Sequence, residues 1–352
     1  MNEELFLKLI SGETTGAVPT VLKAGLSGLS LFYRCGVSAR NLAFDIGLKR
    51  TWSAPVPVIS VGNLTTGGTG KTPFVAWLAN WFQDQSLKPG LLSRGYRSLD
   101  NQSNDEKLLL DNLCPGVPHL QDPDRCHSAQ FACEEYGTKV LILDDGFQHR
   151  KLNRQLDIVL IDALNPWGFG ALLPRGLLRE PMSSLNRASL VVLTRVDQVP
   201  PEQLTELKKQ ITRTTGQKQI VEVAFPPQQL INAVGDTKHL DEIKGARIYA
   251  FCGIGNPQGF KQTLEKMNGE LLEFQSYPDH YHYSESDLQE ISEKLEQHNA
   301  DFAVTTHKDL VKIPQNNLGT KPLWALQIGC QIIARQEFLD VSLENIRKQI
   351  VA

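Results

Sequence analysis

A glycine-rich stretch that ends in lysine and threonine is the clearest sign of chemistry in this sequence. An apolar run at 56–61 leads into the loop, and an apolar helical pattern follows from Phe74 to Trp81. Strand, glycine loop, Lys-Thr and helix in this order are typical of a phosphate-binding P-loop. Glycine lets backbone N–H groups surround an anion, and the helix adds the positive end of its dipole. The predicted nucleotide-binding residues are Thr65, Thr66, Gly67, Gly68, Thr69, Gly70, Lys71 and Thr72.

Two residues of this loop have specific expected roles. Lys71 would reach the β- and γ-phosphates, and the Thr72 hydroxyl would hold Mg²⁺. The usual pattern G-x-x-x-x-G-K-[ST] has glycine where this chain has Thr65, with Gly67 and Gly68 inside the loop instead. An ordinary glycine turn before a helix is the alternative, and the order of the four features favours phosphate binding.

Two adjacent acids, Asp144 and Asp145, follow the apolar run 139–143. A carboxylate at the end of a buried strand is the Walker-B arrangement, which binds Mg²⁺ directly or through water. The alternative is a solvated Asp-Asp-Gly turn. Gln148 and His149 lie on the same loop and could meet phosphate or could be exposed.

Several other polar residues follow predicted strands. Arg94 and Arg97 come after the run 89–93 and are anion-binding candidates, as is Arg179 in the Pro/Gly-bounded loop 174–181, which also holds Glu180. That loop could be an active-site loop or a surface loop with a salt bridge. Lys308 follows the run 302–305 and could contact phosphate.

An acid and a histidine are candidates for proton transfer. Asp105 follows the second predicted strand and could accept a proton from a hydroxyl nucleophile, although a helix N-cap is the simpler interpretation. His280 stands in the run 277–283, which is rich in histidine and aromatic residues. It could pair with a carboxylate, or it could belong to a surface histidine cluster.

The composition excludes several classes. The chain has 352 residues, of which 41% are hydrophobic and 21% charged, and its net charge of −3 gives no reason to expect nucleic acid as a partner. Its six cysteines contain no C-x-x-C pair, so neither a zinc site nor a disulfide framework is predicted. No secretory signal and no apolar run of about 18 residues is evident, so a transmembrane helix is not expected.

The pattern of apolar runs predicts an α/β protein. Continuous apolar strands separated by helices indicate a P-loop NTPase-like parallel sheet covered on both faces, followed by a smaller second α/β lobe. The predicted strands are 56–61, 89–93, 139–143, 157–162, 189–194, 219–224, 246–252, 270–275, 302–305 and 323–327. The predicted helices are 71–84, 123–136, 200–214, 256–268, 284–298 and 341–350.

These elements suggest three parts: a membrane-associating helical segment at 1–50, a P-loop lobe at 51–228, and a second lobe at 229–352 joined by a short hinge. Asp105 and His280 then fall in different lobes, so hinge closure would bring them together. The N-terminal segment is apolar with isolated basic residues between 17 and 50. Such a segment suits a membrane interface, and a helix packed on the parent domain is the alternative.

Taken together, the motifs resemble those of the tetraacyldisaccharide 4′-kinase family, the lipid A 4′-kinases of Gram-negative bacteria. The resemblance covers most of the chain and rests on Gly-Asn-Leu-Thr, Gly-Gly-Thr-Gly-Lys-Thr-Pro, Ser-Arg-Gly-Tyr, Asp-Asp-Gly-Phe-Gln-His, Leu-Arg-Glu-Pro and Pro-Asp-His. It implies a kinase that uses ATP and Mg²⁺ to phosphorylate the 4′-hydroxyl of a tetraacylated glucosamine disaccharide 1-phosphate, forming lipid IVA. It also implies a peripheral protein on the cytoplasmic face of the inner membrane, with no obligate protein partner.

The resemblance further implies roles for individual residues. Asp105 and His280 would form a dyad that deprotonates the hydroxyl, and Asp144, Asp145 and Glu180 would attend to metal and phosphate. Arg94, Arg125, Gln148 and His149 would lie near the site. The chain departs from the family in reading Ser-Asn-Asp-Glu-Lys where members often have Val-Gly-Asp-Glu-Pro, and Thr-His-Lys-Asp for Thr-Glu-Lys-Asp. Because acyl chains leave a bilayer only at high cost, such a kinase must come to the membrane, which favours an interfacial N-terminal helix.

The alternative function is a P-loop nucleotide switch of the ParA or signal-recognition class that acts with a protein partner. ParA-type loops carry an early second lysine, and Thr66 occupies that position here.

Overall fold

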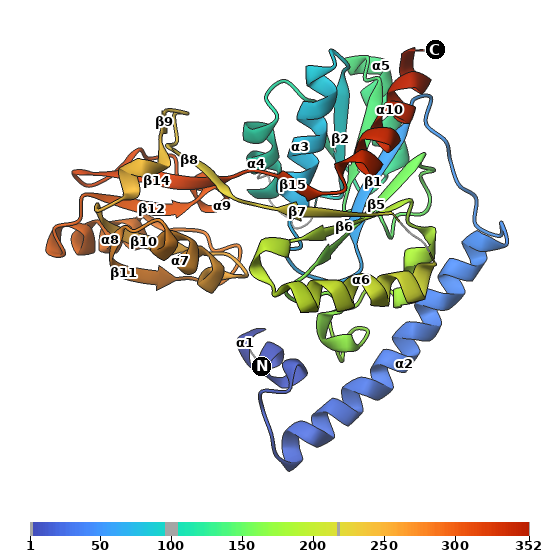
Figure 1. Ribbon diagram of the computed structural model, residues 1–352, viewed down its shortest axis with the longest axis horizontal. Helices are drawn as coiled ribbons and strands as arrows, with labels where there is room; N and C mark the ends of the chain where they lie inside the picture. The colour runs from blue at the N-terminus through green and yellow to red at the C-terminus, as the bar shows by residue number, and fades with distance from the viewer. Residues whose placement is uncertain (1–2, 96–104, 217–218, 352) are drawn as a thin grey trace. The chain divides into compact units, whose positions relative to one another are not determined.

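The chain forms two compact units in a computed structural model that describes residues 3–95, 105–216 and 219–351. Unit 1 holds the chain up to Gly95, Val117–Ala224 and everything from Gln331 onward. Unit 2 holds Phe225–Cys330 together with helix α4 (Asp105–Leu113). Each unit is an α/β body of its own, so the predicted fold class is confirmed (Figure 1).

Unit 1 is built on an eight-stranded sheet in the order β15-β7-β6-β5-β1-β4-β2-β3. All neighbours are parallel except β15, which runs antiparallel to β7. The strands are β1 (Val58–Asn63), β2 (Pro89–Ser93), β3 (His119–Gln121), β4 (Val140–Asp144), β5 (Leu156–Asp162), β6 (Leu190–Thr194), β7 (Ile220–Ala224) and β15 (Gln331–Ala334). Every residue of β1 is buried, as expected for a strand covered on both faces.

Helices cover this sheet through apolar side chains. Ala129 and Ala132 of α5 (Arg125–Tyr136) pack with Leu141 and Leu143 of β4. On the part of the sheet formed by β5 and β6, Leu207 and Ile211 of α6 (Pro201–Thr215) join the core. The remaining helices of unit 1 are α1 (Glu3–Ser11), α2 (Ala17–Asp45), α3 (Lys71–Asp84) and α10 (Gln336–Val351), with 3₁₀ turns η1 (Gly168–Gly170), η2 (Met182–Arg187) and η3 (Val196–Gln198).

Unit 2 has a seven-stranded mixed sheet whose main path is β11-β10-β12-β14-β8-β9, with β13 paired to β14. Side chains of β10 alternate between two cores: Tyr249 and Phe251 pack with α8, while Ile248 and Ala250 pack with α7. The elements are β8 (Pro227–Ile231), β9 (Thr237–Lys238), η4 (Leu240–Ile243), β10 (Arg247–Cys252), α7 (Pro257–Lys266), β11 (Glu270–Ser276), α8 (Glu285–Gln297), β12 (Phe302–Thr306), α9 (His307–Leu310), β13 (Asn317–Leu318) and β14 (Lys321–Ile328).

The division into units differs from the expected split at 51–228 and 229–352. The C-terminal β15 and α10 belong to unit 1, because β15 completes its sheet beside β7. Helix α4 belongs to unit 2, and the N-terminal helices cluster with unit 1 rather than standing apart. The short strands β3, β8, β9, β13 and β15 were not expected, since two to five residues carry little periodicity.

The long helix α2 is mostly solvent-exposed, and Val37 is its one buried residue. Within the described ranges, no helix combines the length and the apolar character needed to cross a membrane.

Candidate active site

The glycine loop connects β1 to α3 as expected for a P-loop. Gly62, near the end of β1, lies so close to Phe147 that an added Cβ would come within 2.6 Å of its backbone nitrogen. Gly70 has φ 82°, a left-handed conformation suited to glycine, and it precedes the first residue of α3. Because Gly70 has no side chain to cap the helix, no side chain at that position competes with an anion for the first N–H groups.

Contacts from neighbouring segments fix the loop. The hydroxyl of Thr194, at the end of β6, donates to the carbonyl of Thr69 over 3.0 Å. The next residue, Arg195, donates to the carbonyl of Gly68 over 2.8 Å. On the other side, the Thr66 N–H donates to the carbonyl of Leu177 over 2.8 Å. The loop conformation is therefore held by both β6 and the 168–179 segment.

Lys71 and Asp145 meet beside this loop. Lys71 Nζ lies 3.6 Å from Asp145 Oδ1 and donates to Asn63 Oδ1 over 3.2 Å. Arg179 donates to both oxygens of Asp145, over 2.7 and 2.8 Å. Burial raises the pKa of Asp145, but Lys71 and Arg179 outweigh that effect and hold the pKa well below its usual range. The acid is thus ionised, and two cations neutralise it.

The loop after β4 carries the other expected polar groups. Arg125 donates to the backbone carbonyls of Asp144, over 3.0 Å, and Asp145, over 3.4 Å. Gln148 Nε2 donates to the carbonyl of Asn63 over 3.0 Å, which ties the loop to β1. Burial, followed by Arg125 and other nearby cations, lowers the pKa of His149 to about 4, so its imidazole is neutral at physiological pH.

Three further candidates of the sequence analysis are Thr72, Arg94 and Arg97. Thr72 is the second residue of α3, next to Lys71. Arg94 lies near enough to Arg125 for its charge to add to burial in lowering the pKa of Arg125. Arg97 lies outside the described residues.

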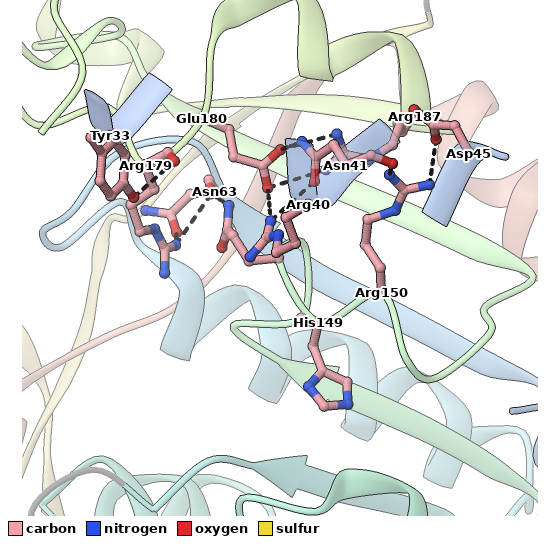
Figure 2. A network of polar contacts seen from close by, with 12 residues as sticks. Tyr33, Arg40, Asn41, Asp45, Asn63, His149, Arg150, Arg179, Glu180 and Arg187 are labelled. Atoms are coloured by element: carbon pink, nitrogen blue, oxygen red, sulfur yellow. Dashed lines mark hydrogen bonds and ion pairs between the residues drawn. The ribbon is translucent and has the colours of Figure 1, made fainter. Parts of the chain in front are cut away.

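Glu180 has an environment that argues against the expected metal role. Its carboxylate is fully buried and accepts from Arg40 over 3.2 Å, from Asn41 over 2.7 Å and from Arg187 over 3.0 Å (Figure 2). Both oxygens are therefore occupied by a cluster that joins α2 to the segment after Leu178, and Glu180 differs from Asp145, whose side chain is 32% exposed, in having no exposed surface for an ion to reach. We assign Glu180 to that structural cluster rather than to the metal.

Asp105 and His280, which were expected to act in proton transfer, form a direct hydrogen-bonded pair in unit 2. His280 Nδ1 lies 2.9 Å from Asp105 Oδ2, and Asp105 is the first residue of α4. His280 has φ 61°, a strained conformation for a non-glycine residue and one often found at functional sites. Because both residues belong to unit 2, the expectation that they lie in different lobes and are joined by hinge closure is wrong.

Two lysines near this pair have roles that the sequence did not reveal. Lys308 was expected only to contact phosphate. Its Nζ lies 3.2 Å from His280 Nε2 and donates to Asp279 Oδ1 over 3.0 Å. Lys312, with only 5% of its side chain exposed, donates to Asp309 over 2.9 Å and lies 3.9 Å from Asp105. A buried lysine five residues beyond His307 has no signature in the sequence, although the strand end Thr-His-Lys-Asp marks the vicinity.

Comparison with known proteins places this geometry in context. The family model LpxK, tetraacyldisaccharide-1-P 4′-kinase, matches residues 22–347. A tetraacyldisaccharide 4′-kinase of Syntrophus aciditrophicus (strain SB) is 38% identical over 346 residues, 92% of each chain. One from Halothermothrix orenii is 33% identical over 344 residues, 90% of this chain and 89% of the relative. The crystal structure of the "apo" form of LpxK from Aquifex aeolicus in complex with ATP has a TM-score of 0.75 and 30% identity, covering 92% of this chain and 99% of that one.

Proposed function

This chain belongs to the tetraacyldisaccharide 4′-kinase family, and on that premise we propose how its residues transfer the γ-phosphate of ATP to the 4′-hydroxyl of a tetraacylated glucosamine disaccharide 1-phosphate. The product would be lipid IVA, an intermediate of lipid A. The observation that carries the proposal is the meeting of Lys71 and Asp145 beside the P-loop, which brings a phosphate-binding cation and a metal-binding acid to one place. The nucleotide-switch alternative is set aside, because the family match runs over residues 22–347.

The P-loop would bind ATP through its backbone and Lys71. The N–H groups of residues 66–72 would surround the phosphates, and Lys71 would contact the β- and γ-phosphates. Arg179 presents the paired donors that suit a phosphate oxygen, as they suit the Asp145 carboxylate here. His149 is neutral, and its Nε2 is buried without a hydrogen-bond partner among the described residues, so it could donate to a phosphate without adding charge.

Mg²⁺ fits the oxygen groups of this region. The residues that would hold it are Thr72, Asp144 and Asp145. No group of three or more His, Cys, Asp or Glu side chains in the described ranges is placed to hold a metal ion. Mg²⁺ usually takes one or two carboxylates and completes its shell with phosphate and water, so two strand-end acids suffice. When bound, Mg²⁺ would neutralise charge on the β- and γ-phosphates.

Asp105 would act as the general base. His280 occupies Asp105 Oδ2, and we assign Oδ1 to the 4′-hydroxyl of the sugar. As the sugar oxygen forms its bond to the γ-phosphorus, the hydroxyl proton passes to Asp105 and the bond to ADP breaks. Burial raises the pKa of Asp105, but hydrogen bonds from His280 and its own backbone N–H, with the charge of Lys312, hold it below its usual range, so the base is ionised at neutral pH.

Helix α2 would bring the enzyme to its lipid substrate at the cytoplasmic face of the inner membrane. Its exposed apolar residues Val18, Val21, Leu22, Leu29 and Phe32 fall at positions i, i+3, i+4, i+11 and i+14, which aligns them on one helical face. The only acid in this helix is Asp45, its last residue, while Lys23, Arg34 and Arg40 supply positive charge. An apolar stripe with basic neighbours suits an anionic membrane surface.

A lipid phosphorylation assay tests this proposal. With ATP labelled at the γ-phosphate and the acylated disaccharide in detergent micelles, label should appear in the lipid fraction. Asp105→Asn should lower kcat by about 10²–10⁴-fold while leaving the KM for ATP within about twofold. The control Asp111→Asn changes a half-exposed acid on the same helix and should behave like the wild type. Label released only as inorganic phosphate, or near-normal turnover of the Asp105 variant, would contradict the proposal.

A further inference from the structure

The hydrogen bonds around His280 define which of its nitrogens carries the proton. Lys308 Nζ lies 3.2 Å from His280 Nε2, and an ammonium group can only donate. His280 Nε2 must therefore accept. Asp105 Oδ2 lies 2.9 Å from His280 Nδ1, and an ionised carboxylate can only accept, so Nδ1 must carry the hydrogen. Both partners select the same species, a neutral imidazole protonated on Nδ1.

The charged groups that face His280 come from three segments and act in opposite directions. Asp105 lies on α4, and Asp279 precedes His280 in the chain, with its Oδ2 3.9 Å from His280 Nε2. Both carboxylates favour an imidazolium. Lys308 on α9 opposes them. Lys312 Nζ lies 3.9 Å from Asp105 Oδ2, the oxygen that His280 also contacts. The pKa of His280 lies above its ordinary value, because the hydrogen bond to Asp105 and the charges of Asp279 and Asp105 raise it by more than burial and the charge of Lys308 lower it.

We propose that Lys308 is a positioning residue that opposes protonation of His280 at Nε2, so that Asp105 pairs with a neutral imidazole rather than with an imidazolium. An imidazolium would form a full ion pair with Asp105 and weaken it as a base. A neutral Nδ1–H orients the carboxylate and leaves more of its basicity for the sugar hydroxyl. The inference rests on the base role proposed above.

Lys308→Met provides the main test. Without the lysine, the pKa of His280 should rise by about one pH unit, measured from the chemical shift of its imidazole in an NMR titration assigned with a His280 variant. The acid limb of the kcat profile should move upward by the same amount, so kcat should fall about tenfold at pH 6.5 and recover at pH 9. A merely structural role would lower kcat equally at all pH values, which would overturn the proposal.

Three further variants control this experiment. Lys308→Arg retains the charge and should keep the pKa of His280 near that of the wild type. Asp279→Asn removes a negative charge that opposes the effect of Lys308, so the pKa of His280 should fall. This variant provides a test even if Lys308→Met folds poorly. Lys244→Met makes the same change at an exposed lysine of unit 2 and should alter neither quantity.

The NMR titration needs no substrate, so it separates this inference from the proposed function. An unchanged pKa in Lys308→Met, or an unchanged pKa in Asp279→Asn, would overturn the role of Lys308. A raised pKa with an unshifted kcat profile would show that the charge coupling exists but that the pair does not control proton removal, and the positioning role would be rejected together with the base role.

Discussion

Glu180 is a fully buried carboxylate whose charge is balanced by two arginines. Arg187 lies 3.0 Å and Arg40 lies 3.2 Å from its oxygens. We expect Glu180→Gln, which preserves the shape and removes the charge, to leave the two guanidinium groups uncompensated. The free energy of unfolding should fall by about 3 kcal/mol at pH 7, measured by urea denaturation. The control Glu344→Gln breaks an exposed pair with Arg347, which solvent screens, and should lower the free energy of unfolding far less.

The difference in free energy of unfolding between the wild type and Glu180→Gln should depend on pH. Burial raises the pKa of Glu180, but Arg187 and other donors outweigh it and hold the pKa below its ordinary value of 4.5. A carboxyl group with a depressed folded pKa stabilises the protein above its unfolded pKa and loses that contribution as the pH falls. The stability difference between wild type and Glu180→Gln should therefore be largest above pH 4.5 and shrink below it. A difference that does not change with pH would contradict this assignment.

At this scale the sequence predicted groups that act through fixed motifs. Lys71, Asp145 and Arg179 lie together because strand ends and the P-loop impose their positions, and the roles expected of them remain predictions. The contacts that argue against a metal role for Glu180 were not evident from the sequence, since its partners Arg40 and Asn41 lie on a helix far from it in the chain. Lys312 was missed for the same reason: its burial depends on tertiary packing.

Helix α2 has two faces with different surroundings. On one, Ser30 donates to the carbonyl of Leu172 over 2.9 Å and Tyr33 donates to the carbonyl of Arg179 over 3.1 Å. The other presents the exposed stripe that includes Val21, at 70% exposure, and Phe32, at 77%. The helix is thus attached to the segment that pairs with the P-loop, while its apolar side chains remain uncovered within the described chain.

Replacing two residues of this stripe tests the membrane contact. Val21→Ser combined with Phe32→Ser should weaken binding to vesicles that contain anionic lipids by about tenfold or more, because each side chain gains apolar burial in the bilayer. Vesicle sedimentation measures the change. Val234→Ser replaces an equally exposed apolar residue of unit 2 and should have no effect. Unchanged binding of the double variant would remove α2 from this role.

Helix α10 packs on unit 1, although the sequence analysis placed it in the second lobe. Leu343 of α10 is fully buried in unit 1. Leu343→Ala should lower the free energy of unfolding by about 2–5 kcal/mol. Hydrogen exchange should show the loss of protection in β7 and α3 of unit 1, and not in β10 or β12 of unit 2.

The matched control is Val341→Ala, on the same helix but 58% exposed, which should change stability by less than about 0.5 kcal/mol. Loss of protection confined to unit 2 would contradict the assignment of α10.

The comparison of sequence and structure follows from these elements. The parallel strands and their helices were predicted because continuous apolar runs and 3.6-residue periodicity are local signals. The family and its ATP-dependent kinase activity were also predicted, and both are confirmed. The domain boundaries were not predicted, because no local pattern in 331–351 or in α4 indicates the sheet or core on which each segment packs.

The return of β15 to the first sheet has a consequence for how the protein is made. A ribosome completes all strands of unit 2 by residue 328, before Gln331 emerges. The nascent sheet of unit 1 therefore waits with β7 as an open edge until residues 331–334 have been translated, and an exposed strand edge is a template for aggregation. Chains whose translation stalls before Gln331 would be the ones that chaperones must protect.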